Sequence, residues 1–262
     1  MSHIDFSRAW AAVLAATLVA GLLLAAAFAT GADAQELTLT GETVVLDPGH
    51  GGSDSGAVNG TYRIKEKDQN LDVAYRLKTL LEASGATVYM TRGGDPNNPN
   101  GPGVKDPGDD AFADDATLSN NDRYTYANTT RADILVSIHM NGSSNTNEDY
   151  TTTLFGKWRK DKEPAYAIFG DNVDPPKSNP PTYGLRTLPA ADGTGNYIAT
   201  RSPYSYASGV LLKSNMPATI AETVFITNNA EAALLSDGTG TRQQQIAEAL
   251  EKGMENYLST HN

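Results

Sequence analysis

Two histidines follow short apolar runs that are typical of buried strands. The run 44–46 leads through Asp-Pro-Gly to His50, and the run 134–138 leads directly to His139. In an open α/β sheet, residues just beyond the carboxyl ends of the strands line the ligand crevice. The other two of the four histidines stand near the termini. Because imidazole is the commonest protein ligand for a transition metal, the internal pair indicates a metal site at one sheet edge.

A carboxylate would complete such a site, and two acids precede a predicted helix between the histidines. These are Glu66 and Asp68, and the helix dipole favours an acid at either position without any metal. Two imidazoles and one carboxylate are a standard ligand set for catalytic zinc, which keeps a fourth position for water. Zinc lowers the pKa of that water to about 7 and so makes it a nucleophile at neutral pH. The residues alone leave the choice between Glu66 and Asp68 open.

Hydrolysis at such a centre also needs a group that moves protons. Glu222 lies in the β-branched run 218–225, where a buried acid is costly unless it has a partner or a task. Burial beside a metal would tune this carboxylate for general-base work. The alternative is a buried ion pair between Glu222 and an arginine such as Arg123.

The hydrophobic pattern predicts strands that alternate with helices, which is an α/β fold. Strands are predicted at 44–46, 87–90, 134–138 and 218–225, and helices at 69–84, 121–131, 243–258 and from 228 onward. The first strand, helix and second strand form a βαβ unit, which makes the two strands parallel. The segments 93–118 and 142–208 lack clear periodicity and are expected to be irregular.

The N-terminus carries a targeting segment. Residues 9–29 are almost wholly apolar, and Ala-Asp-Ala at 32–34 suits a signal peptidase, so we expect 1–34 to be a cleaved signal peptide. An uncleaved membrane anchor is the alternative, because the apolar run is nearly long enough to span a bilayer. Either reading predicts export. A linker at 35–42 and one domain at 43–262 would follow.

The composition excludes several classes of protein. The net charge of −11 argues against a nucleic-acid partner, because phosphate contacts need lysine and arginine. The chain has no cysteine, which excludes disulfides and thiolate metal sites. The length after the targeting segment suits a single domain with a sizeable core.

Five segments together carry a stronger signal than any one of them. They are 46–52, 66–71, Arg123 with 127–128, 132–141 and 221–228. In content and order they resemble the zinc-dependent N-acetylmuramoyl-L-alanine amidases of the type 3 family, which cleave bacterial peptidoglycan. The resemblance runs from about Thr43 to the C-terminus.

The resemblance implies a role for each site residue. His50, Glu66 and His139 would bind one Zn²⁺ per chain, and Glu222 would be the catalytic carboxylate. Asn141 becomes a candidate substrate contact. The implied reaction is hydrolysis of the amide between the lactyl group of N-acetylmuramic acid and L-alanine of the stem peptide. The implied fold is an amidase or zinc-exopeptidase-like domain with a mixed, mainly parallel sheet of about six strands flanked by helices.

The partners follow from the same resemblance. Peptidoglycan is the expected partner, a membrane is expected only if the anchor stays uncleaved, and the domain is expected to be a monomer in the cell envelope, periplasm or extracellular space. The irregular segments 93–118 and 142–208 depart from the family and leave the substrate contacts, any lid and any activator protein open. Trp158, Tyr166 and Tyr183 are candidates for stacking on sugar or peptide, with ordinary packing as the alternative.

Two other functions stay open at this point. One is a zinc hydrolase that acts on a different amide or peptide, because only the crevice walls would differ. The other is a non-catalytic relative that binds the wall, which would need a damaged site.

Overall fold

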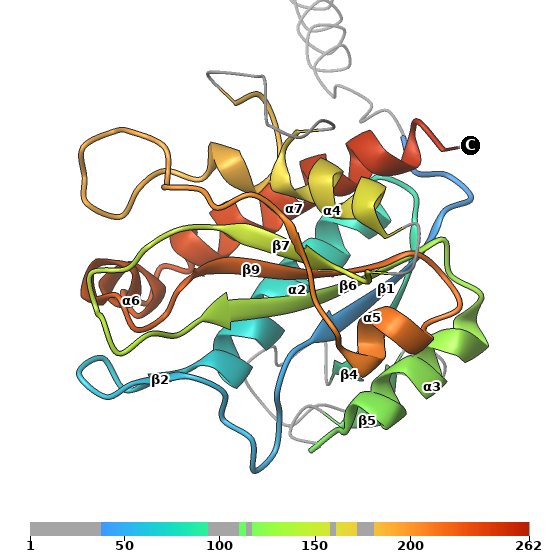
Figure 1. Ribbon diagram of the computed structural model, residues 1–262, viewed down its shortest axis with the longest axis horizontal. Coiled ribbons are helices and arrows are strands. Elements are labelled where there is room, and N and C mark those ends of the chain that lie inside the picture. The colour runs from blue at the N-terminus through green and yellow to red at the C-terminus, as the bar shows by residue number, and fades with distance from the viewer. Residues whose placement is uncertain (1–37, 94–109, 114–116, 158–160, 172–180, 262) are drawn as a thin grey trace, which may run out of the picture. The chain divides into compact units, whose positions relative to one another are not determined.

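The computed structural model describes residues 38–93, 110–113, 117–157, 161–171 and 181–261 (Figure 1). The predicted signal or anchor segment 1–34 lies outside these ranges, as do most of 93–118 and parts of 142–208. Within the described ranges, no helix has the length and apolar character needed to cross a bilayer.

A seven-stranded sheet forms the centre of the fold. Its strands are β1 (Thr43–Pro48), β4 (Thr87–Gly93), β5 (Asp110–Ala113), β6 (Ile134–Asn141), β7 (Thr152–Phe155), β8 (Tyr204–Ser205) and β9 (Ala218–Phe225). They lie in the order β5-β4-β1-β6-β9-β7-β8. Neighbouring strands are parallel except for β7, which runs antiparallel to β9. The predicted mixed, mainly parallel sheet is confirmed, with the two-residue β8 added at one edge.

Helices cover both faces of this sheet (Figure 1). One face carries α2 (Glu66–Ala83), α4 (Lys162–Phe169) and α7 (Thr241–Leu258), and the other carries α3 (Asn120–Thr130) and α5 (Gly209–Lys213). A hairpin of β2 (Val58–Asn59) and β3 (Ile64–Lys65), the short helix α6 (Asn229–Leu235) and the 3-10 helix η1 (Leu185–Thr187) complete the described elements.

The burial of both faces explains the continuous apolar runs of the central strands. Val44 and Leu46 belong to the larger hydrophobic cluster, and Val45 belongs to the smaller one on the opposite face. Side chains alternate across a strand, so a strand covered on both sides is apolar at every position. Leu39, within the predicted linker 35–42, also packs in the larger cluster.

Two element boundaries differ from the sequence prediction. Helix α2 begins at Glu66, three residues before the predicted start, because the periodic apolar positions mark only the part of the helix that faces the core. Strand β6 continues to Asn141, so His139 lies within the strand and not after it. The ladder with β9 extends beyond the apolar run, since backbone pairing does not require apolar side chains. Both shifts bring Glu66 and His139 onto regular elements.

Candidate functional site

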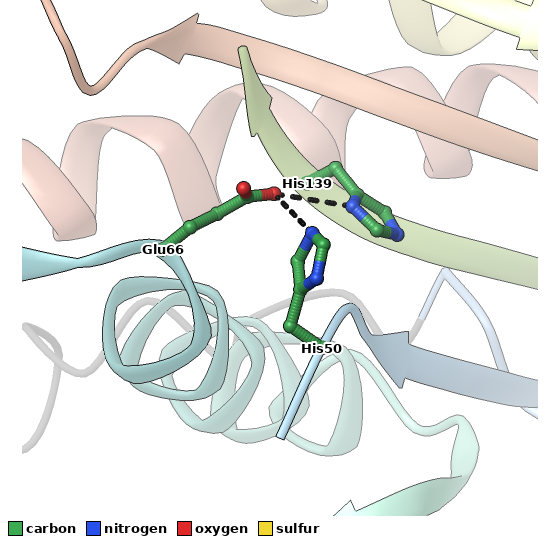
Figure 2. Close-up of side chains that lie close together, drawn as sticks. All are labelled: His50, Glu66 and His139. Carbon is green, nitrogen blue, oxygen red and sulfur yellow. Dashed lines mark hydrogen bonds and ion pairs between the residues drawn. The ribbon is translucent and has the colours of Figure 1, made fainter. Parts of the chain in front are cut away.

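Three side chains from distant parts of the chain converge at the carboxyl edge of the sheet. His50 follows β1, Glu66 is the first residue of α2, and His139 lies near the end of β6. Figure 2 shows them pointing toward one another. Oε1 of Glu66 lies 3.0 Å from Nε2 of His50 and 3.1 Å from Nδ1 of His139. One potential ligand atom from each residue lies within 4.8 Å of the others.

This arrangement fits a tetrahedral zinc ion. Zinc bonds to nitrogen and oxygen are about 2.0–2.2 Å long, which holds tetrahedral ligand atoms roughly 3.3 Å apart. The two distances from Glu66 are close to that spacing. The other acid that the sequence left open, Asp68, is exposed and outside this group. Among the described residues, Glu66 is therefore the carboxylate that accompanies the two histidines.

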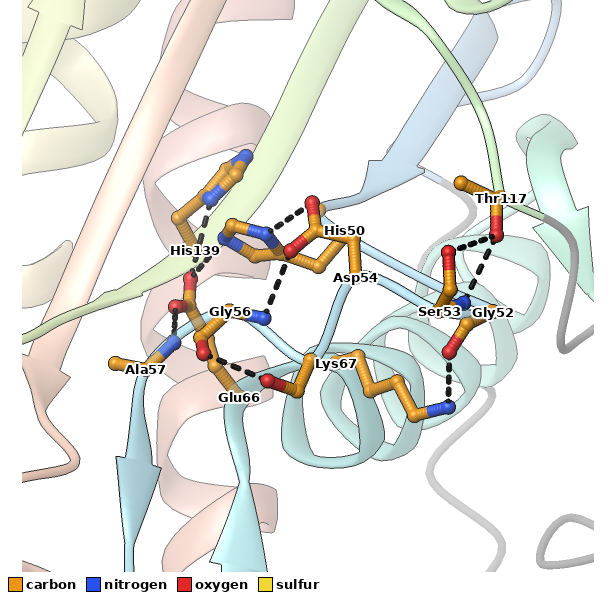
Figure 3. A network of polar contacts seen from close by, with 12 residues as sticks. His50, Gly52, Ser53, Asp54, Gly56, Ala57, Glu66, Lys67, Thr117 and His139 are labelled. Atoms are coloured by element: carbon orange, nitrogen blue, oxygen red, sulfur yellow. Dashed lines mark hydrogen bonds and ion pairs between the residues drawn. The ribbon is translucent and has the colours of Figure 1, made fainter.

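Asp54 contacts the ring nitrogen of His50 that Glu66 does not contact. Its Oδ2 lies 2.8 Å from Nδ1 of His50, on the side of the ring away from Glu66 (Figure 3). Histidines that bind metal commonly donate their second ring N–H to a carboxylate, which fixes the tautomer and the ring orientation. The sequence does not indicate this role for Asp54. Its only signal was its place four residues after His50 in a glycine-rich turn.

The backbone around the histidines is shaped for close approach. His50 has a φ of 62°, a left-handed conformation that is uncommon for residues other than glycine. A Cβ on Gly49 would overlap the imidazole ring of His139, and a Cβ on Gly56 would lie 2.5 Å from Oε2 of Glu66. Only glycine at these positions leaves room for the converging side chains.

Glu66 is held as an ionised acceptor. Its Oε1 also accepts from the backbone N–H of Met140 at 3.1 Å, and its Oε2 accepts from that of Ala57 at 2.9 Å (Figure 3). Burial raises its pKa, but the hydrogen bonds and charges of His139 and His50 outweigh burial and hold that pKa well below its usual range. For His50 the effect of burial has the opposite sign and lowers the pKa. The hydrogen bonds and charges of Glu66, and then those of Asp54, outweigh burial and raise the pKa of His50 to about 9.

Arg123 fixes the chain just before His50 and does not pair with Glu222. It donates to Asp47 at 2.7 Å and to the carbonyl of His50 at 2.7 Å. Burial raises the pKa of Asp47, but the Arg123 charge and the Ser137 and Thr91 hydroxyls lower it overall. The predicted alternative, a Glu222–Arg123 pair, is therefore wrong. Arg123 instead neutralises the buried carboxylate that ends β1.

Glu222 lines the same pocket as the three converging residues. It lies on β9 directly beside His139, because the two residues are register partners in the parallel β6–β9 pair. Burial raises the pKa of Glu222, the charge of His139 opposes this, and the charge of Glu66 adds to it. The pocket thus holds two carboxylates whose pKa values move in opposite directions, a pattern that separates a fixed anion from a proton-transfer group.

The remaining sequence candidates divide between the pocket and the framework. Asn141 lines the pocket, and its buried Nδ2 has no hydrogen-bond partner among the residues that the structure describes. Asn128 bonds to the backbone of Lys213 and Asn215 and so joins α3 to the segment after α5. Tyr166 is buried in the framework.

Two pocket tyrosines were missed by sequence analysis. Tyr204 and Tyr206 line the pocket from the irregular segment 142–208. No periodicity distinguishes them from Tyr183, which lies apart from this pocket, or from Trp158, which is outside the described residues. The fold alone brings them beside Glu222.

Comparison with known proteins gives a consistent result. The chain is 28% identical over 226 residues to the germination-specific N-acetylmuramoyl-L-alanine amidase of Bacillus subtilis (strain 168), an alignment that covers 85% of this chain and 82% of the relative. Among solved structures, an N-acetylmuramoyl-L-alanine amidase from Clostridium difficile 630 is 27% identical with a TM-score of 0.65, covering 84% of this chain and 98% of that one. The CwlD amidase from Clostridioides difficile, solved in complex with the GerS lipoprotein, is 27% identical with a TM-score of 0.61 over 84% of this chain and 99% of that one.

The match extends over nearly all of the described domain. The sequence profile of the type 3 amidase family, described as N-acetylmuramoyl-L-alanine amidase, matches residues 44–256. This range holds the strands β1 to β9, apart from Thr43 at the start of β1, and all four residues His50, Glu66, His139 and Glu222. This chain belongs to that family and is an amidase that hydrolyses the bond between N-acetylmuramic acid and L-alanine in peptidoglycan.

Proposed function

We propose that this protein is a zinc-dependent peptidoglycan amidase in which His50, Glu66 and His139 hold one zinc ion and Glu222 transfers the proton. The observation that carries the proposal is the convergence of the three ligand atoms within 4.8 Å, with Glu222 on the adjacent strand. The Asp54 carboxylate behind His50 supports it, because this second contact is typical of metal-binding histidines.

Zinc at this position would polarise the scissile carbonyl and lower the pKa of the attacking water. The protein's own groups do the rest. Glu222 accepts the proton of the water on a carboxylate oxygen and then donates it to the leaving nitrogen of L-alanine. Its raised pKa suits both halves of that transfer. Asn141, which lines the pocket, contacts the substrate there.

Digestion of purified peptidoglycan tests the proposal. The expected products are peptides with a free N-terminal L-alanine and glycan strands of unchanged length. A chelator should abolish the release, and zinc should restore it, whereas magnesium should not, because nitrogen ligands favour zinc. Full activity after exhaustive removal of zinc would contradict the proposal.

The same assay addresses the two rival functions. A non-catalytic wall-binding protein would bind sacculi without releasing L-alanine, although His50, Glu66, His139 and Glu222 are all in place. A zinc hydrolase with another substrate would cleave short soluble peptides faster than intact sacculi. We expect the opposite preference.

We further propose that the domain at 43–262 is exported to the cell envelope, with 1–34 as a cleaved signal peptide and 35–42 as a linker. The apolar run and the Ala-Asp-Ala motif at 32–34 support this, as does the wall substrate of the family. N-terminal sequencing of the exported protein should begin at Gln35. We expect a monomer, which light scattering of the purified chain can check.

A further inference from the structure

The pocket has a second wall that takes no part in the chemistry described above. We call it the tyrosine wall: Tyr204 and Tyr206 line the pocket, and Arg201 with Tyr150 lies next to Tyr204, outside the pocket lining itself. Tyr204 and Tyr206 line the pocket with Glu222, yet they remain 40% and 50% exposed. Exposed aromatic rings beside a reacting group offer contact area to a substrate.

Arg201 is held in place by the rings of this wall. Its Nη1 donates to the hydroxyl of Tyr150 at 3.2 Å. Its guanidinium carbon lies 5.9 Å from the ring centroid of Tyr150 and 5.2 Å from that of Tyr204. The backbone N–H of Arg201 also donates to the carbonyl of Thr151 at 3.0 Å. Cation–π contacts of this kind orient a guanidinium without neutralising its charge.

The charge of Arg201 is available to a ligand. Among the described residues, no carboxylate forms an ion pair with it, and Glu148 acts on it only through longer-range charge. The side chain is exposed. The arginine that lines the pocket itself, Arg123, is already committed to Asp47 and to backbone carbonyls.

The surroundings make such a cation useful. The protein carries a net charge of −11, and Asp54, Glu66 and Glu222 all line the pocket. The zinc ion proposed above would offset this charge at the reacting centre, and a cation beside Tyr204 would do the same for an anionic group that lies farther along the substrate. A guanidinium binds a carboxylate through two parallel hydrogen bonds, which gives position as well as attraction.

We propose that Arg201, oriented by Tyr150 and Tyr204, binds a carboxylate on the peptide side of the substrate and so sets specificity. This inference rests on the proposed function. The lactyl carboxyl of the sugar is consumed in the scissile amide, so the free carboxylates near the bond belong to the peptide. Tyr204 connects the two functions, because its ring contacts Arg201 and it lines the same pocket as Glu222.

A pair of soluble muramoyl-peptides tests this assignment. One keeps its peptide carboxylates, and the other carries them as carboxamides. Arg201→Gln should raise KM for the carboxylate substrate roughly tenfold, the usual scale for a charged hydrogen bond, while kcat stays within about twofold. For the carboxamide substrate, the wild-type KM should already be high and the variant should match it. Arg201→Glu should raise KM for the carboxylate substrate still further.

Arg131→Gln provides the matched control. Arg131 is exposed and precedes β6, the strand that carries His139 near its other end. The Arg131→Gln substitution therefore removes the same charge as Arg201→Gln, but far from the pocket. We expect both of its KM values to equal those of the wild type. Equal rises on both substrates for Arg201→Gln, or no rise on either, would overturn the assignment. Absence of turnover by the wild type would instead refute the proposed function.

Discussion

The two walls of the pocket are built in different ways. The first, which we call the histidine wall, consists of residues 49–57 with Glu66 and His139. There, hydrogen bonds of 2.8–3.1 Å tie the ligands together, and two glycines leave no space for a Cβ. In the tyrosine wall, Arg201, Tyr204 and Tyr206 are exposed. Its backbone pairs with β7, but among the described residues its side chains are held by one hydrogen bond and by ring contacts.

This difference follows from what each wall must do. Ligands of a reacting centre have to stay within a fraction of an ångström of the productive geometry, which requires a locked shell around them. A surface that recognises a flexible polymer tolerates movement, and such surfaces are commonly carried on loops. Changes in the histidine wall should therefore abolish chemistry, whereas changes in the tyrosine wall should alter binding.

The largest effect is expected for His139→Ala. Removing this imidazole breaks the ligand set, so zinc content should fall from one ion per chain to near zero, and turnover should drop by at least about a thousandfold. Elemental analysis and the L-alanine release assay measure the two effects. A variant that loses activity but still binds one zinc tightly would place His139 outside the metal site.

Glu222→Gln should separate chemistry from metal binding. Glutamine keeps the size of the side chain but cannot accept the proton, so kcat should fall by about 10²–10⁴-fold while zinc content stays at one per chain. Loss of zinc in this variant would show that Glu222 is a ligand and not the proton-transfer group.

Asp54→Asn tests the support behind His50. The amide cannot hold the imidazole in the same way, so zinc affinity should weaken by about 10–100-fold in competition with a chelator. Asp68→Asn is the matched control, because Asp68 is an exposed acid near the start of the same helix as Glu66. Equal weakening in both variants would point to net charge as the cause and not to the His50 contact.

Gly49→Ala tests the close packing of the histidine wall. The added methyl would overlap His139, and the free energy of unfolding should fall by about 1–3 kcal/mol, the usual cost of overpacking. In Gly60→Ala the methyl would meet no atom within 4 Å, so its stability should be close to that of the wild type. Denaturant melts of the two variants make the comparison. Equal losses would mean that the glycine preference is a backbone effect.

A smaller effect is expected at Asp149, which directly precedes Tyr150 in the chain. Burial, and then the charge of Glu231, raise the pKa of Asp149 to about 7. The folded state therefore binds a proton that the unfolded state releases near pH 4, so this group's contribution to stability falls as pH rises from about 4 to about 7. Asp149→Asn should flatten the stability–pH curve in that window. An unchanged curve would contradict the raised pKa of Asp149.

The same two walls mark what the sequence could predict. His50, His139 and Glu222 stand out because each interrupts or follows an apolar run, and such runs report strands directly. The choice of Glu66 over Asp68 needed the family resemblance at first, since a helix start favours both acids. The structure separates them because helix α2 begins at Glu66 and directs its carboxylate at the histidines.

The tyrosine wall could not be predicted in that way. Arg201 and Tyr150 are 51 positions apart in an irregular segment, and their contact depends on how β7 and β8 close the edge of the sheet. Aromatic residues in such segments look alike in sequence. Trp158 and Tyr183 were therefore as plausible as Tyr204, and Arg123 looked available to Glu222 until its pairing with Asp47 was visible.

One measurement tests the central claim most directly: an anomalous difference map, recorded at the zinc absorption edge, from crystals of the zinc-loaded protein. The account predicts a single strong peak bonded to His50, Glu66 and His139, with the Glu222 carboxylate facing it. A peak on other residues, or none between these three side chains, would contradict it.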